Sequence, residues 1–145
     1  MINSIIHIKQ NYLLMTQKDK DLLLKDLCAR LPYGVKLYCN SNVMMCIGPY
    51  TLNTITLDRI FNKHTEYVPF DEVKPYLFPL SSMTEEQKEE FNTQSLKLQL
   101  QVIDEEIMYE KATEFEVDFY NKHHLDWRGL IPLGLAIDAT NLNIY

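Results

Sequence analysis

The hydrophobic pattern of the chain changes its period at Pro32–Gly34, and this change limits the fold to a mixture of helix and sheet. From residue 18 to residue 31 apolar side chains recur three and four residues apart, which is the spacing of one face of an amphipathic helix. That face consists of Leu24, Leu27, Cys28 and Leu31. From residue 35 to residue 39 apolar and polar side chains alternate instead, as in a strand with one buried face. The helix should therefore end before the proline, and a strand should follow the glycine.

Three further segments of the first half have the character of strands. Residues 43–47 follow the turn-forming sequence Asn40–Asn42, and residues 52–60 and 66–70 come next. We expect three or four consecutive antiparallel strands in a small, strongly curved sheet, with an SH3-like half-barrel as the specific architecture. Residues 71–80 are expected to form one helical turn and then an extended, apolar connection between two prolines.

Two helices are expected in the second half of the chain. Thr84 and Gln87 stand in the capping-box spacing, so one helix should begin at Thr84. Asp104 is placed to cap a longer helix that ends at Lys122. Between them, residues 96–102 alternate leucine or valine with lysine and glutamine. This period predicts a strand, although the residue types also favour helix, and a strand is our prediction.

Together these segments predict one α+β domain over residues 1–145, with an N-terminal helix, a small curved antiparallel sheet and C-terminal helices. The helix and the sheet occupy residues 15–80, and residues 81–145 form a mainly helical part. Residues 1–14 are open to two interpretations. They are part of the domain, or they are an extension that precedes a translation start at Met15.

Composition and charge favour a cytoplasmic protein without a membrane segment, and they oppose nucleic acid as a partner. No apolar run approaches the roughly 20 residues of a membrane span, and the N-terminal region lacks the features of a signal peptide. The three cysteines have no Cys-x-x-Cys spacing, which fits free thiols in a reducing compartment. A formal net charge of −6 with scattered lysines and arginines is unfavourable for binding a phosphate backbone.

Three blocks of the sequence resemble a known family. They are Lys20–Lys36 (KDLLLKDLCARLPYGVK), Phe70–Gln87 (FDEVKPYLFPLSSMTEEQ) and Phe119–Asp138 (FYNKHHLDWRGLIPLGLAID). In this order, over somewhat under half of the chain, they are similar to a family of uncharacterised small proteins encoded by gut anaerobic bacteria, their prophages and mobile elements. No activity is established for this family, so the resemblance supplies no catalytic residues. Residues 92–113 lie outside the three blocks, and we expect a partner-specific surface there.

One cluster of potential metal ligands is present, at His123, His124 and Asp126. Adjacent histidines on a helix project about 100° apart, so both do not easily reach one ion. We assign the two histidines instead to the last turn of the helix, where positive charge complements the helix dipole. No metal is predicted.

No constellation in the sequence assembles a catalytic site. Asp118, His124 and either Ser81 or Ser82 contain the residue types of a hydrolase triad, but neither serine lies in a nucleophile-elbow motif. Cys28 falls on the apolar face predicted for its helix, which disfavours it as a nucleophile. With four glycines the chain also lacks a glycine-rich phosphate loop. We predict no catalytic residue and no cofactor.

Aromatic and acidic side chains are the candidates for binding a protein partner, because tyrosine, tryptophan and arginine are enriched at interface hot spots. The long second helix should also carry the most acidic surface of the chain. The candidate residues are Trp127, Arg128, Tyr38, Tyr50, Glu106 and Glu110. The alternative for Trp127 and Arg128 is to anchor the tail onto the domain, with Arg128 paired to a helix carboxylate. The alternative for the tyrosines is a half-buried position in the sheet.

The leading hypothesis is therefore a non-enzymatic module that binds a protein partner. One alternative is a phage or mobile-element inhibitor of a host defence enzyme, whose acidic surface occupies a nucleic-acid channel or blocks the enzyme. Another is a small-molecule enzyme, which requires a pocket with titratable groups. The oligomeric state stays open, because a curved sheet can leave an edge for a second copy.

The C-terminal block generates a first prediction about stability. Its apolar side chains are each worth roughly 1.5 to 3 kcal/mol when fully buried, against a total stability of about 5 to 15 kcal/mol. They are Trp127, Leu130, Ile131, Leu133, Leu135 and Ile137. Deletion from Trp127 onward should leave an insoluble or unfolded product, whereas removal of residues 1–14 should be far milder. Soluble yield and melting temperature test this, and an unchanged melting temperature without the tail would make the block a free recognition peptide.

Overall fold

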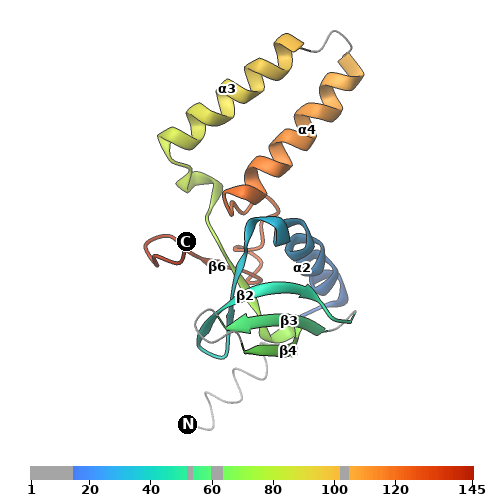
Figure 1. Cartoon of the computed structure of the whole chain (residues 1–145), viewed down its shortest axis with the longest axis vertical. Coiled ribbons are helices and arrows are strands. Elements are labelled where there is room, and N and C mark those ends of the chain that lie inside the picture. Colours follow the sequence, from blue (N-terminus) through green and yellow to red (C-terminus); the bar gives the residue numbers. More distant parts are fainter. Residues whose placement is uncertain (1–14, 52–53, 60–63, 102–104) are drawn as a thin grey trace.

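The computed structural model describes residues 15–51, 54–59, 64–101 and 105–145, with side chains given outside residues 101–112 (Figure 1). Figure 1 shows a body built of a curved sheet, one helix and the C-terminal tail, from which a hairpin of two long helices projects. The helices are α2 (Gln17–Arg30), α3 (Glu85–Gln101) and α4 (Glu105–Lys122). The predicted α+β class, with a helix, a sheet and then helices, is confirmed.

Helix α2 begins and ends where the sequence indicates. Thr16 forms a capping box with Asp19: Thr16 Oγ1 accepts from the Asp19 N–H at 3.1 Å, and Asp19 Oδ2 accepts from the Thr16 N–H at 3.3 Å. The helix ends before Pro32, and a 3-10 turn (Leu31–Tyr33) leads to Gly34, whose positive φ of 68° suits glycine.

The buried face of α2 differs from the predicted one. Its buried residues are Leu23, Asp26, Leu27 and Arg30, and Cys28 is exposed, so the assignment of Cys28 to the apolar face was wrong. The difference arises because two charged residues are buried as a pair, which a search for apolar periodicity cannot detect.

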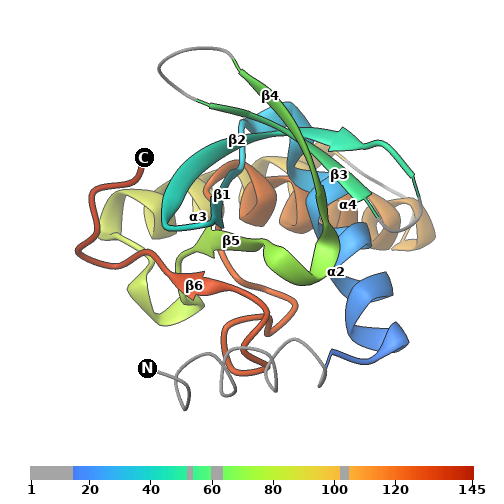
Figure 2. The same ribbon diagram turned by 90° about the horizontal axis from the view of Figure 1, so that it is seen from below.

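Six strands form one sheet in the order β4-β3-β2-β1-β5-β6. Neighbours pair antiparallel except β5 and β6, which are parallel. The bounds are β1 (Lys36–Cys39), β2 (Asn42–Pro49), β3 (Thr54–Arg59), β4 (Thr65–Pro69), β5 (Lys74–Leu77) and β6 (Ile137–Asp138). Figure 2 shows the curvature of the sheet and places β6 beside β5. The antiparallel strands are confirmed, and the SH3-like architecture stays a prediction.

Two details of the sheet follow from local sequence. Asn40 and Ser41 join β1 to β2 with positive φ angles of 48° and 65°, the left-handed backbone that a tight hairpin turn requires. A short 3-10 turn (Phe70–Glu72) precedes β5, close to the predicted helical turn. The residues expected as an extended connection are a strand, because β1 and β6 flank β5 on both sides.

The main core lies between α2 and the inner face of the sheet. Alternate residues of β1, β2 and β3 point toward the helix, and Phe70 closes the end of the layer. The buried strand residues include Leu37, Cys39, Met44, Cys46, Ile55 and Leu57. The opposite face of these strands has no covering layer among the described residues. The sheet is thus one-sided, with an apolar inner face and an open outer face.

The helical hairpin corrects the prediction for residues 96–102. Helix α3 starts after Thr84, whose Oγ1 accepts from the Gln87 N–H at 3.1 Å, and it continues to Gln101. The half-buried residues of α3 are helically spaced, at positions 87, 90, 91, 95 and 98. A strand was the wrong prediction because packing against α4 requires the helical period. The predicted cap at Asp104 and the last residue of the predicted strand, Val102, lie outside the described residues.

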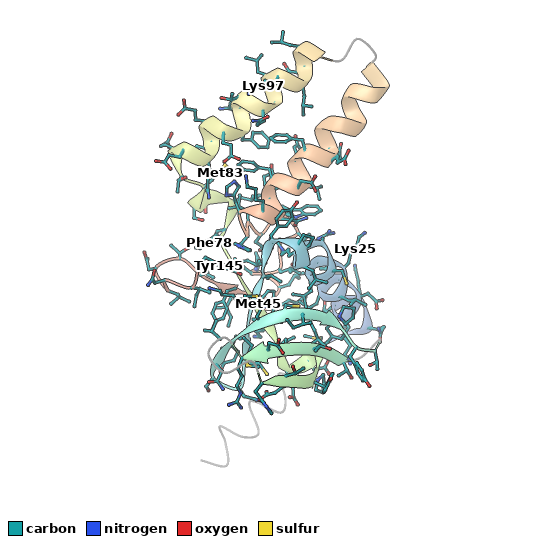
Figure 3. All side chains as sticks on the ribbon, in the orientation of Figure 1. Lys25, Met45, Phe78, Met83, Lys97 and Tyr145 are labelled. Carbon is teal, nitrogen blue, oxygen red and sulfur yellow. The ribbon has the colours of Figure 1, made fainter. Side chains whose placement is uncertain are left out.

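Aromatic rings hold the two helices together near the body. Phe91 of α3 contacts Phe115, Phe119 and Tyr120 of α4, with ring centroids 5.4, 5.2 and 6.1 Å apart. Such ring pairs contribute beyond the area that they bury. Figure 3 shows side chains in the space between the two helices.

The tail closes the body, as the sequence predicts. Leu125 bridges to Phe78, β6 pairs with β5, and Leu130 and Leu135 are buried in a second cluster. Leu133 is an exception, because it is 57% exposed. Of the six apolar side chains of the block, Leu130 and Leu135 are buried, Trp127, Ile131 and Ile137 are half-buried, and Leu133 is exposed.

Candidate functional site

The six candidate binding residues lie in three separate places. Trp127 and Arg128 follow α4 inside the junction between the hairpin and the body. Tyr38 belongs to β1, and Tyr50 follows β2. Glu106 and Glu110 belong to α4, and their side chains lie outside the described residues. These residues are not brought together into one site.

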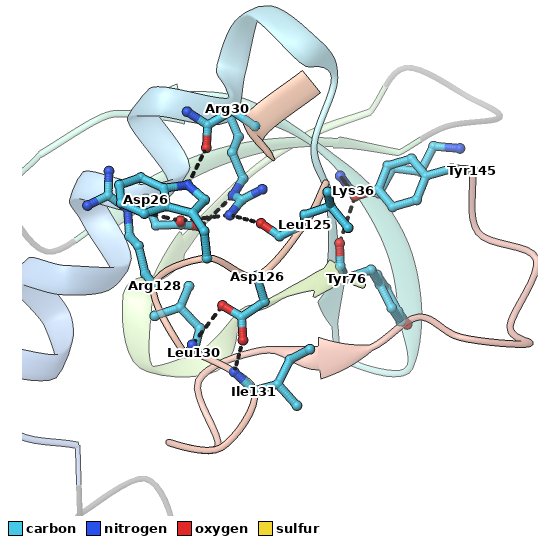
Figure 4. Close-up of polar contacts among 12 residues, drawn as sticks. Asp26, Arg30, Lys36, Tyr76, Leu125, Asp126, Arg128, Leu130, Ile131 and Tyr145 are labelled. Carbon is cyan, nitrogen blue, oxygen red and sulfur yellow. Dashed lines mark hydrogen bonds and ion pairs between the residues drawn. The ribbon is translucent and has the colours of Figure 1, made fainter. Parts of the chain in front are cut away.

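The junction is built around a buried ion pair (Figure 4). Arg30 Nε donates to Asp26 Oδ2 at 2.8 Å, and Arg30 Nη2 donates to Asp26 Oδ1 at 3.1 Å. The same Nη2 donates to the carbonyl oxygen of Leu125 at 2.7 Å. Both charged side chains are fully buried. The pair therefore fixes the chain after α4 against α2.

Arg128 completes this network from the tail. Its Nε lies 3.2 Å from Asp26 Oδ1, and its guanidinium lies over the ring of Trp127 at 4.0 Å from the centroid. Burial lowers the pKa of Arg128, while the nearby carboxylate of Asp26 opposes that shift. Trp127 Nε1 donates in turn to Asn121 Oδ1 at 3.0 Å. These contacts support the anchoring alternative for Trp127 and Arg128, since both side chains bind the protein's own helices.

The potential metal ligands His123, His124 and Asp126 make separate contacts. Both carboxylate oxygens of Asp126 accept backbone N–H groups, from Leu130 and Ile131, each at 2.8 Å. His123 Nε2 lies 3.2 Å from Glu90 Oε2. Within the described part of the chain, no group of three or more His, Cys, Asp or Glu side chains is placed to hold a metal ion.

His124 occupies an unusual backbone position. It follows the last residue of α4 by two positions and has a φ of +56°. Its N–H donates to the carbonyl of Asn121 at 3.2 Å, and the N–H of Leu125 donates to the carbonyl of Tyr120 at 2.8 Å. This pair of bonds is a Schellman motif, in which the left-handed residue is usually glycine or asparagine. A histidine there carries a conformational cost.

The imidazole of His124 is stacked under Tyr145. The two rings are 3.7 Å apart at the centroids and inclined by 13°. Burial, together with the positive charges of Arg30, His123 and Lys36, lowers the pKa of His124 to about 4, so the ring is neutral at pH 7. It is a stacking surface rather than a cation.

The residues of the hypothetical triad do not form one. Ser82 Oγ donates to the carbonyl of Pro79 at 2.7 Å, Ser81 and Asp118 are exposed, and His124 is buried. Cys28 is a free, exposed thiol, which removes the reason given for excluding it as a nucleophile.

The outer face of the sheet carries an exposed aromatic group. The rings of Tyr50 and Tyr67 are 4.7 Å apart and inclined by 51°, and the residues are 66% and 59% exposed. Tyr38 and Ile47 are also exposed, at 36% and 50%. Ile47 and Tyr67 were not among the six candidate residues chosen from the sequence. The two-residue alternation in β2 and β4 was the available signal, because it places both residues opposite the buried ones.

Comparisons with known proteins add no assignment: no protein-family model, no curated protein and no solved structure matches this chain. Among the described residues, no helix has the length and apolar character needed to cross a membrane. The function has to be inferred from the surfaces themselves.

The ion pair at the junction predicts a large effect of a single charge. Asp26→Asn keeps the size of the side chain but leaves Arg30 buried without its partner charge. We expect a loss of about 3 to 5 kcal/mol in the free energy of unfolding, measured by urea denaturation. The exposed Asp21 of the same helix provides the control, and Asp21→Asn should change stability by less than about 0.5 kcal/mol. Equal effects of the two substitutions would contradict this account.

The lowered pKa of His124 predicts a loss of stability in acid. The unfolded chain binds more protons than the folded chain between the ordinary pKa of 6.5 and the folded value of about 4, so stability falls as the pH drops through that range. The shift corresponds to about 3 kcal/mol. His124→Asn tolerates the left-handed backbone and should lack this component in urea titrations from pH 7 to pH 4. Parallel curves for the variant and the wild type would show that His124 is not the source.

Proposed function

We propose that this protein is a protein-binding module and that the outer face of its sheet is the recognition surface. The observation that carries the proposal is the pair formed by Tyr50 and Tyr67, two neighbouring rings of which more than half is exposed. Tyrosines supply large, rigid contact area and a polar tip, and burying them against a partner yields much of the energy of many interfaces.

The surroundings of this pair support an interface. Ile47 adds an exposed aliphatic side chain on the same sheet, and Tyr67 is paired across the strands with Thr56. On the same face, two positions from Tyr67, Thr65 Oγ1 donates to Asp58 Oδ1 at 2.6 Å, which gives a polar rim. An apolar centre with a polar rim is the usual anatomy of a protein–protein interface.

The acidic hairpin supports a second candidate, an inhibitor of a host defence enzyme. Exposed carboxylates line the described part of both helices, and their charge suits a channel that binds nucleic acid. They are Glu85, Glu86, Glu89, Glu114, Glu116 and Asp118. The resemblance to proteins of prophages and mobile elements favours the same candidate. In it the hairpin, and not the sheet, makes the decisive contact.

Substitutions on the two surfaces separate these candidates. Tyr50→Ser with Tyr67→Ser should reduce capture of a specific partner from native lysate at least tenfold, because two hot-spot rings are lost, without a large change in melting temperature. Glu114→Gln with Glu116→Gln and Asp118→Asn is the matched surface control and should retain the partner. The reverse result would favour the inhibitor, and the absence of any specific partner in repeated captures would count against both.

A further inference from the structure

Contacts from the body hold Ile144 and Tyr145, although 40% of Tyr145 stays exposed. The Tyr145 hydroxyl accepts from the Lys36 N–H at 3.0 Å and donates to the Tyr76 carbonyl at 2.9 Å. Lys36 Nζ donates to the Ile144 carbonyl at 2.6 Å and lies 5.3 Å from the centre of the Tyr145 ring. We call Lys36, Tyr76, Phe78 and His124 the tyrosine cradle.

The hydroxyl of Tyr145 takes the place of a backbone hydrogen bond between β1 and β5. Strands β1 and β5 pair Leu37 with Pro75 and Tyr38 with Lys74, so the next pair in the same register is Lys36 with Tyr76. There the phenol oxygen stands between the N–H of one strand and the C=O of the other (Figure 4). Burial raises the pKa of the phenol to about 12, so at pH 7 it retains the proton that it donates. The cradle therefore matches a phenol and not merely an apolar ring.

The body, and not the tail, holds each part of the cradle in place. Lys36 and Tyr76 belong to strands, and His124 is fixed by the Schellman motif. The Phe78 N–H donates to the His124 carbonyl and the Phe78 carbonyl accepts from the Asp126 N–H, each at 2.8 Å. Figure 3 shows Phe78 beside Tyr145. Because contacts within the body position these groups, we expect the cradle to keep its shape without Tyr145, and a preorganised site binds at a lower entropic cost.

The segment that connects Tyr145 to the body lies on the surface. Residues 140–143 are exposed, and Asn141 and Asn143 have positive φ angles of 65° and 53°. Before this segment the chain is attached to β5, where the Ala139 N–H donates to the carbonyl of Leu77 at 2.8 Å. Ile144 and Tyr145 thus reach the cradle at the end of an exposed tether.

Two features of His124 destabilise the folded chain, and holding the tail in place requires neither of them. The residue is held in left-handed backbone, and its buried Nδ1 has no hydrogen-bond partner among the described residues. Strain of this kind persists where the surrounding structure demands it and gathers at binding sites. Here it presents the flat face of the imidazole to an aromatic ring.

We propose that the tyrosine cradle is a binding site for an extended peptide segment with an aliphatic residue followed by an unphosphorylated tyrosine, and that Ile144 and Tyr145 occupy it in cis. The tail is then a plug that competes with a segment of another protein. Phosphorylation is incompatible with the site, because the oxygen lies between two backbone groups. The cradle is separate from the outer sheet face, so its test does not depend on the function proposed above.

The test uses the full chain with Tyr145→Ala and a labelled, amidated peptide of residues 140–145 (TNLNIY). Fluorescence polarisation should show saturable binding to this variant. The peptide with phenylalanine in place of tyrosine should bind at least tenfold more weakly, because it leaves both backbone groups unpaired, and the phosphotyrosine peptide should not bind. Wild-type protein should bind the tyrosine peptide at least tenfold more weakly than the variant, because the tethered plug competes at an effective concentration of about millimolar.

Two controls keep the proposal falsifiable. Adding His124→Gly to Tyr145→Ala removes the stacking ring but keeps the left-handed backbone, and it should abolish peptide binding. If Tyr145→Ala does not fold, Tyr145→Phe loses the two hydroxyl contacts and should bind the tyrosine peptide more tightly than wild type does. A folded variant that shows no saturable binding up to 1 mM peptide, or that binds the tyrosine and phenylalanine peptides equally, overturns the proposal.

Discussion

The buried ion pair of Asp26 and Arg30 is the interaction on which the rest of the arrangement depends. Removing two charges from water is costly, and the cost is met only when additional hydrogen bonds complete the pair. Here Asp26 contacts both Arg30 and Arg128, and Arg30 reaches the carbonyl of Leu125, 95 positions away in the chain. Helix α2, the end of α4 and the tail are therefore joined at one point. That point sets where the helical hairpin leaves the body.

The backbone strain at His124 follows from the same constraint. Leu125 is held by Arg30 on one side and by its bridge to Phe78 on the other. The chain has to leave α4 at Lys122 and reach this position within two residues, so His124 adopts the left-handed conformation. A glycine would make the turn at lower cost. Histidine adds a flat ring, and Tyr145 stacks on that ring.

The sequence was sufficient wherever the determinant is local. The cap at Thr84, the end of α2 before Pro32 and the alternation in the strands all act within a few residues, and the corresponding elements are present. It was insufficient where partners are distant. Residues 96–102 alternate in polarity, yet α4 imposes the helical period on their part of α3. The burial of Asp26 depends on Arg128, and the role of Tyr145 depends on Lys36 and Tyr76; no local pattern encodes those pairings.

Strand β1 links the three environments of the body within four residues. Leu37 and Cys39 enter the core, Tyr38 is exposed on the outer face, and the N–H of Lys36 belongs to the cradle. At the Lys36 end, a phenol oxygen lies between β1 and β5 in place of a direct backbone bond. Two positions along β1, Tyr38 is paired with Lys74 and is exposed on the outer face. The two proposed binding surfaces therefore share a strand but use different groups of it, the backbone N–H of Lys36 in the cradle and the side chain of Tyr38 on the outer face.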